Sequence, residues 1–287
     1  MDSLLKFFSP NSKIRFAMVD VTMSAKALEA RHLSGPTASM ALAEGLAAVA
    51  LLSMDAAQDD EATLLRIAAG GVIGGLTVEA MGDGGLRGFT NVKVLNELDG
   101  AERIETDTAW GDSGMVQIQF SLPGKLLNQA SLKVSPLKVK FVLARYYNQS
   151  MQIPTACEVS VRADAGGLIS ARAMLAQRME DSDMPAFVRV LEQFENGRAV
   201  ELLREGASVE ALGELFGLVD IEERERRDLM FKCRCSRART LAVLKTLKRD
   251  ELETMLKSGK EQAVTCHMCG QTYYATSEDI QKIMDEL

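Results

Sequence analysis

Hydrophobic positions in the first fifty or so residues predict one strand followed by two helices. Residues 12–22 carry apolar side chains at every second position, which is the period of a half-buried strand. Helical spacing follows at about 23–31 and 37–54. The apolar run at 45–54 is too short for a membrane-spanning helix, which needs roughly 17 to 25 residues, and is typical of a buried helix.

The region from residue 62 onward predicts mostly strands. A Gly-Asp-Gly-Gly turn at 82–85 separates two β-forming segments, which indicates a hairpin. A helical stretch near 138–149 precedes alternating residues at 155–162, and Gly166-Gly167 is typical of a turn into another strand or a short helix. This mixture of elements predicts an N-terminal α+β core domain over residues 1–176.

A different pattern begins at residue 177. Up to residue 231, apolar residues recur at helical spacing in short segments interrupted by glycine, which predicts an acidic amphipathic helical linker. This segment holds 7 Arg and 14 Asp plus Glu, so its net charge of −7 equals that of the whole chain. Short, highly charged helices bury little surface alone, so we expect the linker to pack on a neighbour or to become mobile. Residues 232–287 then form a compact C-terminal domain.

Composition narrows the class of protein. Hydrophobic residues make up 47% and charged residues 25% of the 287 residues, which is ordinary for a soluble globular protein. The N-terminus lacks the apolar core and cleavage site of a secretory signal, so we expect a cytoplasmic protein with no membrane partner. In that compartment five cysteines are more often metal ligands or redox thiols than structural disulfides.

Four cysteines form two close pairs near the C-terminus. Cys233 and Cys235 make a C-x-C pair, and Cys266 and Cys269 make a C-x2-C pair after a gap of thirty residues. Zn²⁺ prefers four tetrahedral thiolate or imidazole ligands, and two short pairs supply them when the intervening chain folds back. The spacing predicts one zinc ion held by all four cysteines, with Gly270 letting backbone N–H groups turn toward the sulfurs of the second pair.

The spacing leaves the role of this site open. A permanently closed structural zinc site, a redox-sensitive site, a set of disulfides and a site for another metal are all compatible with it. Basic residues surround the first pair and would favour thiolates, which raises susceptibility to oxidation; they are Lys232, Arg234, Arg237 and Arg239. A domain of about 56 residues is marginal on its apolar core alone, whereas zinc supplies roughly 10 to 16 kcal/mol of apparent binding energy, so metal loss should unfold it.

Other candidate residues predict no chemistry. His267, next to Cys266, is expected to face solvent rather than to replace a ligand. Cys157 stands alone in a predicted strand and is expected to be a small core residue, and His32 has no catalytic partner in the sequence. The chain also lacks a G-x-x-x-x-G-K-[ST] phosphate-binding motif and a dinucleotide fingerprint. We therefore expect neither ATP dependence nor an enzyme.

Three stretches resemble the heat shock protein 33 family of redox-regulated chaperones. Residues 231–274 share its C-x-C-S-R start, its leucine spacing and its closing C-x2-C. Residues 146–155 (YYNQSMQIPT) and 82–87 (GDGGLR) are similar to two further family signatures, and the order of these features matches along nearly the whole chain. Met151 replaces the usual Glu, Gly85 replaces the usual Pro, and the family's Gln and Leu-Pro are missing near Ser170.

The resemblance implies an ATP-independent holdase that binds unfolding client proteins under oxidative stress. It implies an inactive state that is reduced and zinc-bound, and an oxidised state in which Cys233 joins Cys235, Cys266 joins Cys269 and zinc is expelled. Because a disulfide-bonded sulfur is a poor zinc ligand, the small domain would then unfold and the linker would lose its support. Apolar faces exposed in this way would capture clients. The family also implies a homodimer when oxidised.

Two other functions are compatible with parts of the sequence. The basic residues around Cys233 and the pair Tyr273-Tyr274 could serve a zinc module that binds nucleic acid. The net charge of −7, with only +2 in residues 232–287, opposes this function, so we expect no nucleic-acid partner. The C-x2-C pair could be the dithiol of a thiol-disulfide oxidoreductase, but it has no βαβ context and the other cysteine pair favours a metal.

Overall fold

The protein is described by a computed structural model over residues 1–101, 104–164, 166–206 and 208–286. It divides into two compact units, Met1–Lys232 and Cys233–Leu287. Both units contain helices and strands, which confirms the predicted α+β class. The three-part division into 1–176, 177–231 and 232–287 stays a prediction, and its last residue, Leu287, lies outside the described residues.

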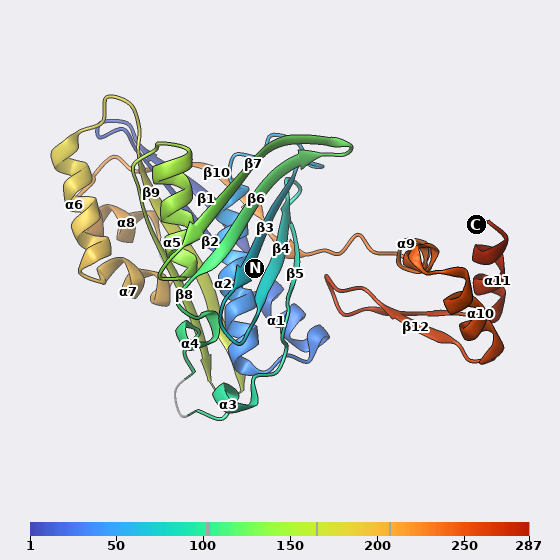
Figure 1. Ribbon diagram of the computed structural model, residues 1–287. Helices are drawn as coiled ribbons and strands as arrows, with labels where there is room; N and C mark the ends of the chain where they lie inside the picture. The colour runs from blue at the N-terminus through green and yellow to red at the C-terminus, as the bar shows by residue number, and fades with distance from the viewer. Residues whose placement is uncertain (102–103, 165, 207, 287) are drawn as a thin grey trace. The chain divides into compact units, whose positions relative to one another are not determined.

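A five-stranded antiparallel sheet forms one layer of the first unit (Figure 1). In the order β10-β1-β2-β9-β8, its strands are Glu222–Asp228, Ser3–Ser9, Ile14–Asp20, Gly167–Arg178 and Thr155–Asp164. Along β2, Phe16 and Met18 belong to one buried cluster, and Ala17 and Val19 belong to another on the opposite face. The prediction of a half-buried strand was therefore wrong about burial, because a layer of helices covers each face.

A six-stranded sheet forms a second layer of this unit. Its strands, in order, are β11 (Met230–Phe231), β5 (Gly85–Thr90), β4 (Gly75–Met81), β3 (Ala62–Ala69), β6 (Gly114–Leu122) and β7 (Lys125–Val134). The short β11 runs parallel to β5, and all other neighbours are antiparallel. The predicted hairpin is confirmed as β4 and β5. Its turn places Gly84 at a φ of 85°, a left-handed conformation that glycine adopts without steric cost.

Helix α2 (Pro36–Leu52) lies between the two sheets and is buried along nearly its whole length (Figure 1). It contacts β9 of one sheet and β4 of the other, which confirms the predicted buried helix. The other helical segments of this region are α1 (Thr22–His32), α3 (Asn96–Asp99), α4 (Asp107–Trp110), α5 (Val139–Arg145) and a π-helical turn at Tyr146–Ser150. In the described part of the chain, no helix is both long and apolar enough to span a membrane.

Glu44 places a carboxylate within this helical layer. It accepts hydrogen bonds from Thr106 Oγ1 at 2.7 Å and from Trp110 Nε1 at 3.0 Å. Burial raises the pKa of Glu44 to about 7 in spite of these hydrogen bonds, and of the nearby charges Asp107 raises the pKa while Lys138 lowers it. Because this pKa lies above the ordinary value of 4.5, Glu44 contributes its full stabilisation below about pH 4.5 and loses it as the pH rises through 7.

We expect the free energy of unfolding of the first unit to fall by roughly 2 to 3 kcal/mol between about pH 5 and pH 8 through this carboxyl group. Urea titrations followed by the fluorescence of Trp110, the chain's single tryptophan, measure the change. Glu44→Gln cannot ionise and should flatten the pH dependence. If the free energy of unfolding changes with pH in the same way in the wild type and in Glu44→Gln, Glu44 does not titrate in this range.

Three short helices cover the face of the five-stranded sheet that α2 leaves free (Figure 1). They are α6 (Met184–Glu195), α7 (Arg198–Glu205) and α8 (Val209–Phe216). Phe216 stacks on Phe16 with 5.1 Å between ring centroids, and Phe194 lies 5.9 Å from Phe216. The helical part of the predicted linker is thus packed on the five-stranded sheet, which buries the apolar sides of its helices.

The last part of the predicted helical linker is not helical. Glu222–Asp228 form β10, which pairs with β1, and Met230–Phe231 form β11. Arg227 donates to the backbone oxygens of Ser53 and Ala56 at 3.2 Å each, and Glu225 pairs with Lys6 at 2.5 Å. Glutamate and arginine dominate this edge strand, so it has no apolar face and the hydrophobic pattern could not reveal it.

The second unit is a small helical assembly around one hairpin. Its elements are α9 (Arg237–Leu241), a 3-10 turn (Ala242–Thr246), α10 (Arg249–Lys257), β12 (Gln262–Thr265), β13 (Thr272–Ala275) and α11 (Ser277–Asp285). The leucine spacing between the two cysteine pairs corresponds to the helical segments that precede Gly259, whereas α11 was not predicted. Among the described residues, the unit's buried core cluster contains Leu241, Leu244, Leu252, Ala275, Ile280, Ile283 and Met284, with partly buried hydrophobic residues packed against it.

Candidate metal centre

The two cysteine pairs lie on different elements of the second unit. Cys233 and Cys235 lie in the extended segment before α9, and Cys266 and Cys269 lie in the turn between β12 and β13. In that turn the N–H groups of Cys269 and Gly270 donate to the Cys266 carbonyl oxygen at 3.3 and 2.8 Å. Gly270 has a φ of 72°, a left-handed conformation that a glycine provides without strain.

The fold brings all four cysteine sulfurs together. The Sγ atoms lie within 4.8 Å of one another, with Cys233 and Cys266 3.9 Å apart and Cys235 and Cys269 3.5 Å apart. Four sulfurs placed tetrahedrally at the usual zinc–sulfur distance of about 2.3 Å are about 3.8 Å apart. The cluster could therefore hold a metal ion, and its ligand type, number and spacing fit zinc.

Burial controls the protonation of the second pair. It raises the pKa of the Cys266 thiol, and it raises the pKa of the fully buried Cys269 thiol to about 12; the thiols of the first pair add to both shifts. Without a cation these sulfurs are therefore protonated, and a metal ion must displace their protons to bind.

Of the basic residues around the first pair, Arg237 pairs with Asp279 at 2.5 Å and Arg239 donates to the Arg234 carbonyl oxygen at 3.0 Å.

A tyrosine that the sequence analysis did not assign to the site contacts one of its sulfurs. Tyr273, on β13, places its Oη 3.3 Å from Cys235 Sγ. This hydrogen bond is the main reason that the pKa of Tyr273 rises to about 12, which keeps the phenol protonated. Alternation along β13 could have indicated such a role, because Tyr273 and Tyr274 must point to opposite faces of the hairpin.

The remaining candidates lie outside the cluster. Among the described residues, the group of potential metal ligands is the four cysteines and does not include His267. Cys157 is partly buried against the core of the first unit, with Sγ 3.0 Å from the Lys140 carbonyl oxygen, and burial raises the pKa of its thiol to about 12. His32 is buried, with Nε2 2.9 Å from the Gly88 carbonyl oxygen.

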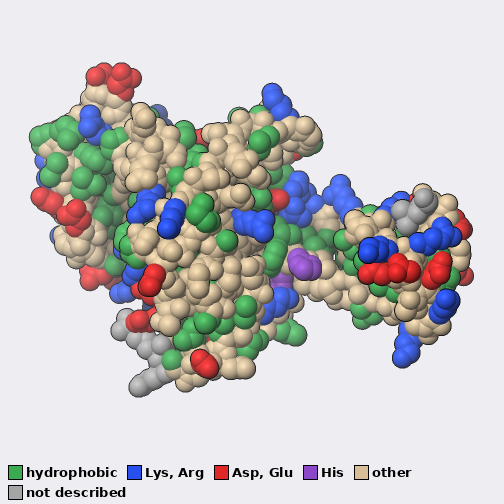
Figure 2. Space-filling view, viewed as in Figure 1, with side chains coloured by type: hydrophobic (Ala, Val, Ile, Leu, Met, Phe, Trp, Pro, Cys, Tyr) green, Lys and Arg blue, Asp and Glu red, His purple; other side chains and the backbone are tan. Residues whose placement is uncertain are grey.

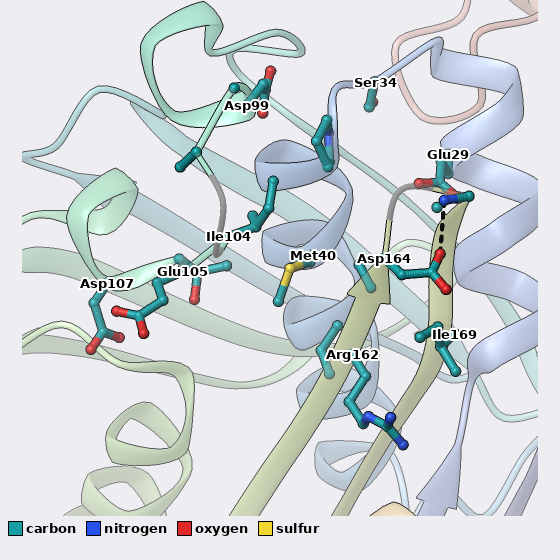
Figure 3. Close-up of a pocket in the computed structure, with 18 of the residues that line it drawn as sticks. Glu29, Ser34, Met40, Asp99, Ile104, Glu105, Asp107, Arg162, Asp164 and Ile169 are labelled. Atoms are coloured by element: carbon teal, nitrogen blue, oxygen red, sulfur yellow. Dashed lines mark hydrogen bonds between the residues drawn. The ribbon is translucent and has the colours of Figure 1, made fainter.

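A cleft of about 1190 Å³ in the first unit carries several acidic side chains, but they are spread around it (Figure 3). Asp99 accepts hydrogen bonds from the N–H groups of Thr37 and Leu95 at 3.0 and 2.7 Å, and Asp164 accepts one from Gly166 at 2.8 Å. These two carboxylates therefore accept hydrogen bonds from backbone N–H groups. Within the described ranges, no group of ligands that could hold a metal lies in this cleft.

The family model described as Hsp33 protein matches residues 2–276 of the chain. The chain therefore belongs to the Hsp33 family. This confirms the resemblance inferred from the cysteine spacing and from the two upstream signatures.

Relatives of the chain in the Hsp33 family match it from end to end. A protein named 33 kDa chaperonin from Oceanobacillus iheyensis is 26% identical, and the match covers 98% of this chain and 99% of that protein. The 33 kDa chaperonin of Symbiobacterium thermophilum is 28% identical, and the match covers 98% of this chain and 97% of that protein. The 33 kDa chaperonin of Geobacter sulfurreducens is 28% identical and covers 100% of this chain and 96% of its own. In fold, the chain is similar to the crystal structure of the 33 kDa chaperonin from Thermotoga maritima, with a TM-score of 0.85. The two sequences are 22% identical, and the match covers 99% of this chain and 98% of that one.

Proposed function

We propose that this member of the Hsp33 family is a redox-regulated, ATP-independent holdase chaperone of the cytoplasm. Its inactive form would carry one Zn²⁺ ion on Cys233, Cys235, Cys266 and Cys269, and its oxidised form would bind unfolding client proteins as a homodimer. The observation that carries the proposal is the convergence of four sulfurs within 4.8 Å of one another in a unit with a very small core. The chaperonin names of its relatives support the client-binding part.

The size of the second unit explains why its metal centre can act as a switch. Its core cluster contains seven buried apolar residues among those that the structure describes, which is little for a unit of about 55 residues. Bound zinc would keep the four sulfurs as thiolates and cross-link the segment before α9 to the β12–β13 turn. Folding of the unit is therefore tied to the chemical state of four side chains.

Oxidation of the cysteines removes the metal ligands. A hydroperoxide takes two electrons from a pair of thiolates: its O–O bond breaks, two protons from solvent complete two oxygen products as water or alcohol, and an S–S bond forms. The family resemblance implies the pairs Cys233–Cys235 and Cys266–Cys269. Since disulfide sulfurs are poor ligands, the cross-link is lost and the second unit unfolds.

The connector (the linker predicted over residues 177–231) is followed by Lys232, the residue before the first cysteine, which is attached to the first unit. Lys232 donates its N–H to the Leu86 carbonyl oxygen at 3.0 Å, and its Nζ pairs with Asp83 at 2.6 Å. Once the chain from Cys233 onward is unfolded, it gains conformational entropy. Ordering the residues next to it then costs more free energy, which destabilises these contacts and β11, a strand of only two residues. Release would then spread into β10 and the acidic helices, whose net negative charge opposes close packing.

The surface under the connector is suited to unfolding clients. The face of the five-stranded sheet below α6–α8 carries Phe7, Phe16 and Met174, which are buried only while those helices are in place. Figure 2 shows further hydrophobic side chains gathered over α6, where Met184 and Val188 are 45% and 44% exposed. Apolar patches that combine aromatic and methionine side chains adapt to irregular partners.

Paired measurements on one preparation test the proposal. We expect the reduced, zinc-loaded chain to leave the aggregation of a chemically unfolded test enzyme unchanged. After hydrogen peroxide with mild heat, we expect it to release one zinc ion per chain and to suppress that aggregation without nucleotide. Cys157→Ser, outside the cluster, should behave like the wild type. Retention of zinc after oxidation, or equal protection by both forms, would refute the mechanism.

A further inference from the structure

The hydrogen bond between Tyr273 and Cys235 joins the core of the second unit to a single sulfur of the metal centre. Tyr273 is partly buried and packs against the core cluster of this unit. Its backbone is held in the hairpin, where β13 pairs it with Val264 of β12. Ring and backbone are thus both fixed, and the hydroxyl is placed 3.3 Å from Cys235 Sγ.

The chemistry of the two groups determines the direction of this hydrogen bond. A thiolate has lone pairs and no hydrogen, so in the metal-loaded protein only the phenol can donate. Hydrogen bonds to charged acceptors are stronger than neutral ones, and this one withdraws charge from Cys235 Sγ. The attack of a thiolate on an electrophile depends on its available charge, so the contact lowers the reactivity of Cys235.

We propose that Tyr273 is a positioning residue that sets the order of oxidation within the first cysteine pair by holding Cys235 as its less reactive sulfur. This inference rests on the redox function proposed above. Cys233 would attack the peroxide first: its sulfur bonds to one oxygen, the O–O bond breaks, and the leaving oxygen departs as water after taking a proton. Cys235 would then attack the sulfenic sulfur of Cys233, forming the S–S bond and releasing hydroxide.

The neighbouring residue offers a matched control. Tyr274 is 54% exposed and follows Tyr273 on the same strand, so its ring points to the other face of the hairpin. Tyr273→Phe and Tyr274→Phe each remove one phenolic oxygen and keep the aromatic ring. Only the first removes a donor from the metal centre, so the two variants separate this contact from a general effect of losing a hydroxyl.

The test uses the full-length, zinc-loaded chain and two independent probes. Brief treatment with iodoacetamide, followed by tandem mass spectrometry, gives the ratio of alkylated Cys233 to alkylated Cys235 without any oxidation. Zinc release under limiting hydrogen peroxide, followed with a chromogenic chelator, gives the rate of switching. In Tyr273→Phe we expect the share of alkylation at Cys235 and the rate of zinc release each to rise roughly fivefold, whereas Tyr274→Phe should match the wild type.

The two probes separate failure of this inference from failure of the proposed function. If Tyr273→Phe binds zinc more weakly but keeps the wild-type alkylation ratio, Tyr273 is only a structural residue and the inference is overturned. An alkylation ratio that favours Cys235 in the wild type, and that the substitution does not move, overturns it as well. If peroxide releases no zinc from any of the three proteins, the redox function fails, and the alkylation ratio still decides the role of Tyr273.

Discussion

Loss of a single metal ligand should unfold the second unit and leave the first one folded. We expect Cys269→Ser to abolish stoichiometric zinc binding, because three sulfurs and a buried hydroxyl do not make a four-thiolate site. The unit then loses an apparent binding energy of roughly 10 to 16 kcal/mol, more than its seven-residue core can replace. Hydrogen exchange followed by mass spectrometry should show fast exchange throughout 233–286 and protection in α2.

A strong chelator acting on the wild type should give the same pattern of exchange, because it removes the same cross-link. Cys157→Ser is the matched control: it changes one thiol to a hydroxyl in the first unit, where Cys157 contacts a backbone oxygen rather than the cluster. Zinc content and protection of the second unit should be unchanged in this variant. If Cys269→Ser keeps residues 233–286 protected, the metal centre is not what holds this unit together.

Weakening the attachment of the acidic helices should activate the protein without oxidation. Phe216 is 1% exposed and stacks between Phe16 and Phe194, so Phe216→Ala leaves a cavity that costs about 3 to 5 kcal/mol of connector stability. An effect of this size raises the population of the undocked connector on the order of a hundredfold or more. We expect the reduced, zinc-loaded variant to bind an apolar dye and to suppress the aggregation of an unfolded test enzyme.

Val219 provides the control for this experiment, since it lies in the same connector and is fully exposed. Val219→Ala should leave dye binding and client protection at the low wild-type level. Zinc content must stay at one ion per chain in both variants, so that activation is assigned to the helices and not to the metal centre. A Phe216→Ala protein that binds the dye but protects no client would show that the surface under the connector is not where clients bind.

The parts of the fold that were predicted correctly are those in which local pattern and final burial agree. Helix α2 is apolar at most of its positions and lies between two sheets, and the hairpin of β4 and β5 is marked by its glycine turn. Strand β1 was missed because its short apolar stretch is broken by Lys6, and this lysine pairs with Glu225 of β10. Helix α11 was missed because it is only nine residues long and its apolar positions are limited to Ile280, Ile283 and Met284.

Residue identity and spacing along the chain are enough to name the four candidate ligands, the family signatures and the concentration of negative charge in residues 177–231. The pairing of β10 with β1 is visible only in the folded chain, because a charged edge strand has no apolar pattern that would indicate its partner. The same holds for the contact of Tyr273 with Cys235, which joins residues 38 positions apart. Spacing can name four sulfurs as candidate ligands, but which of them receives a hydrogen bond from Tyr273 depends on how β13 folds against the segment before α9.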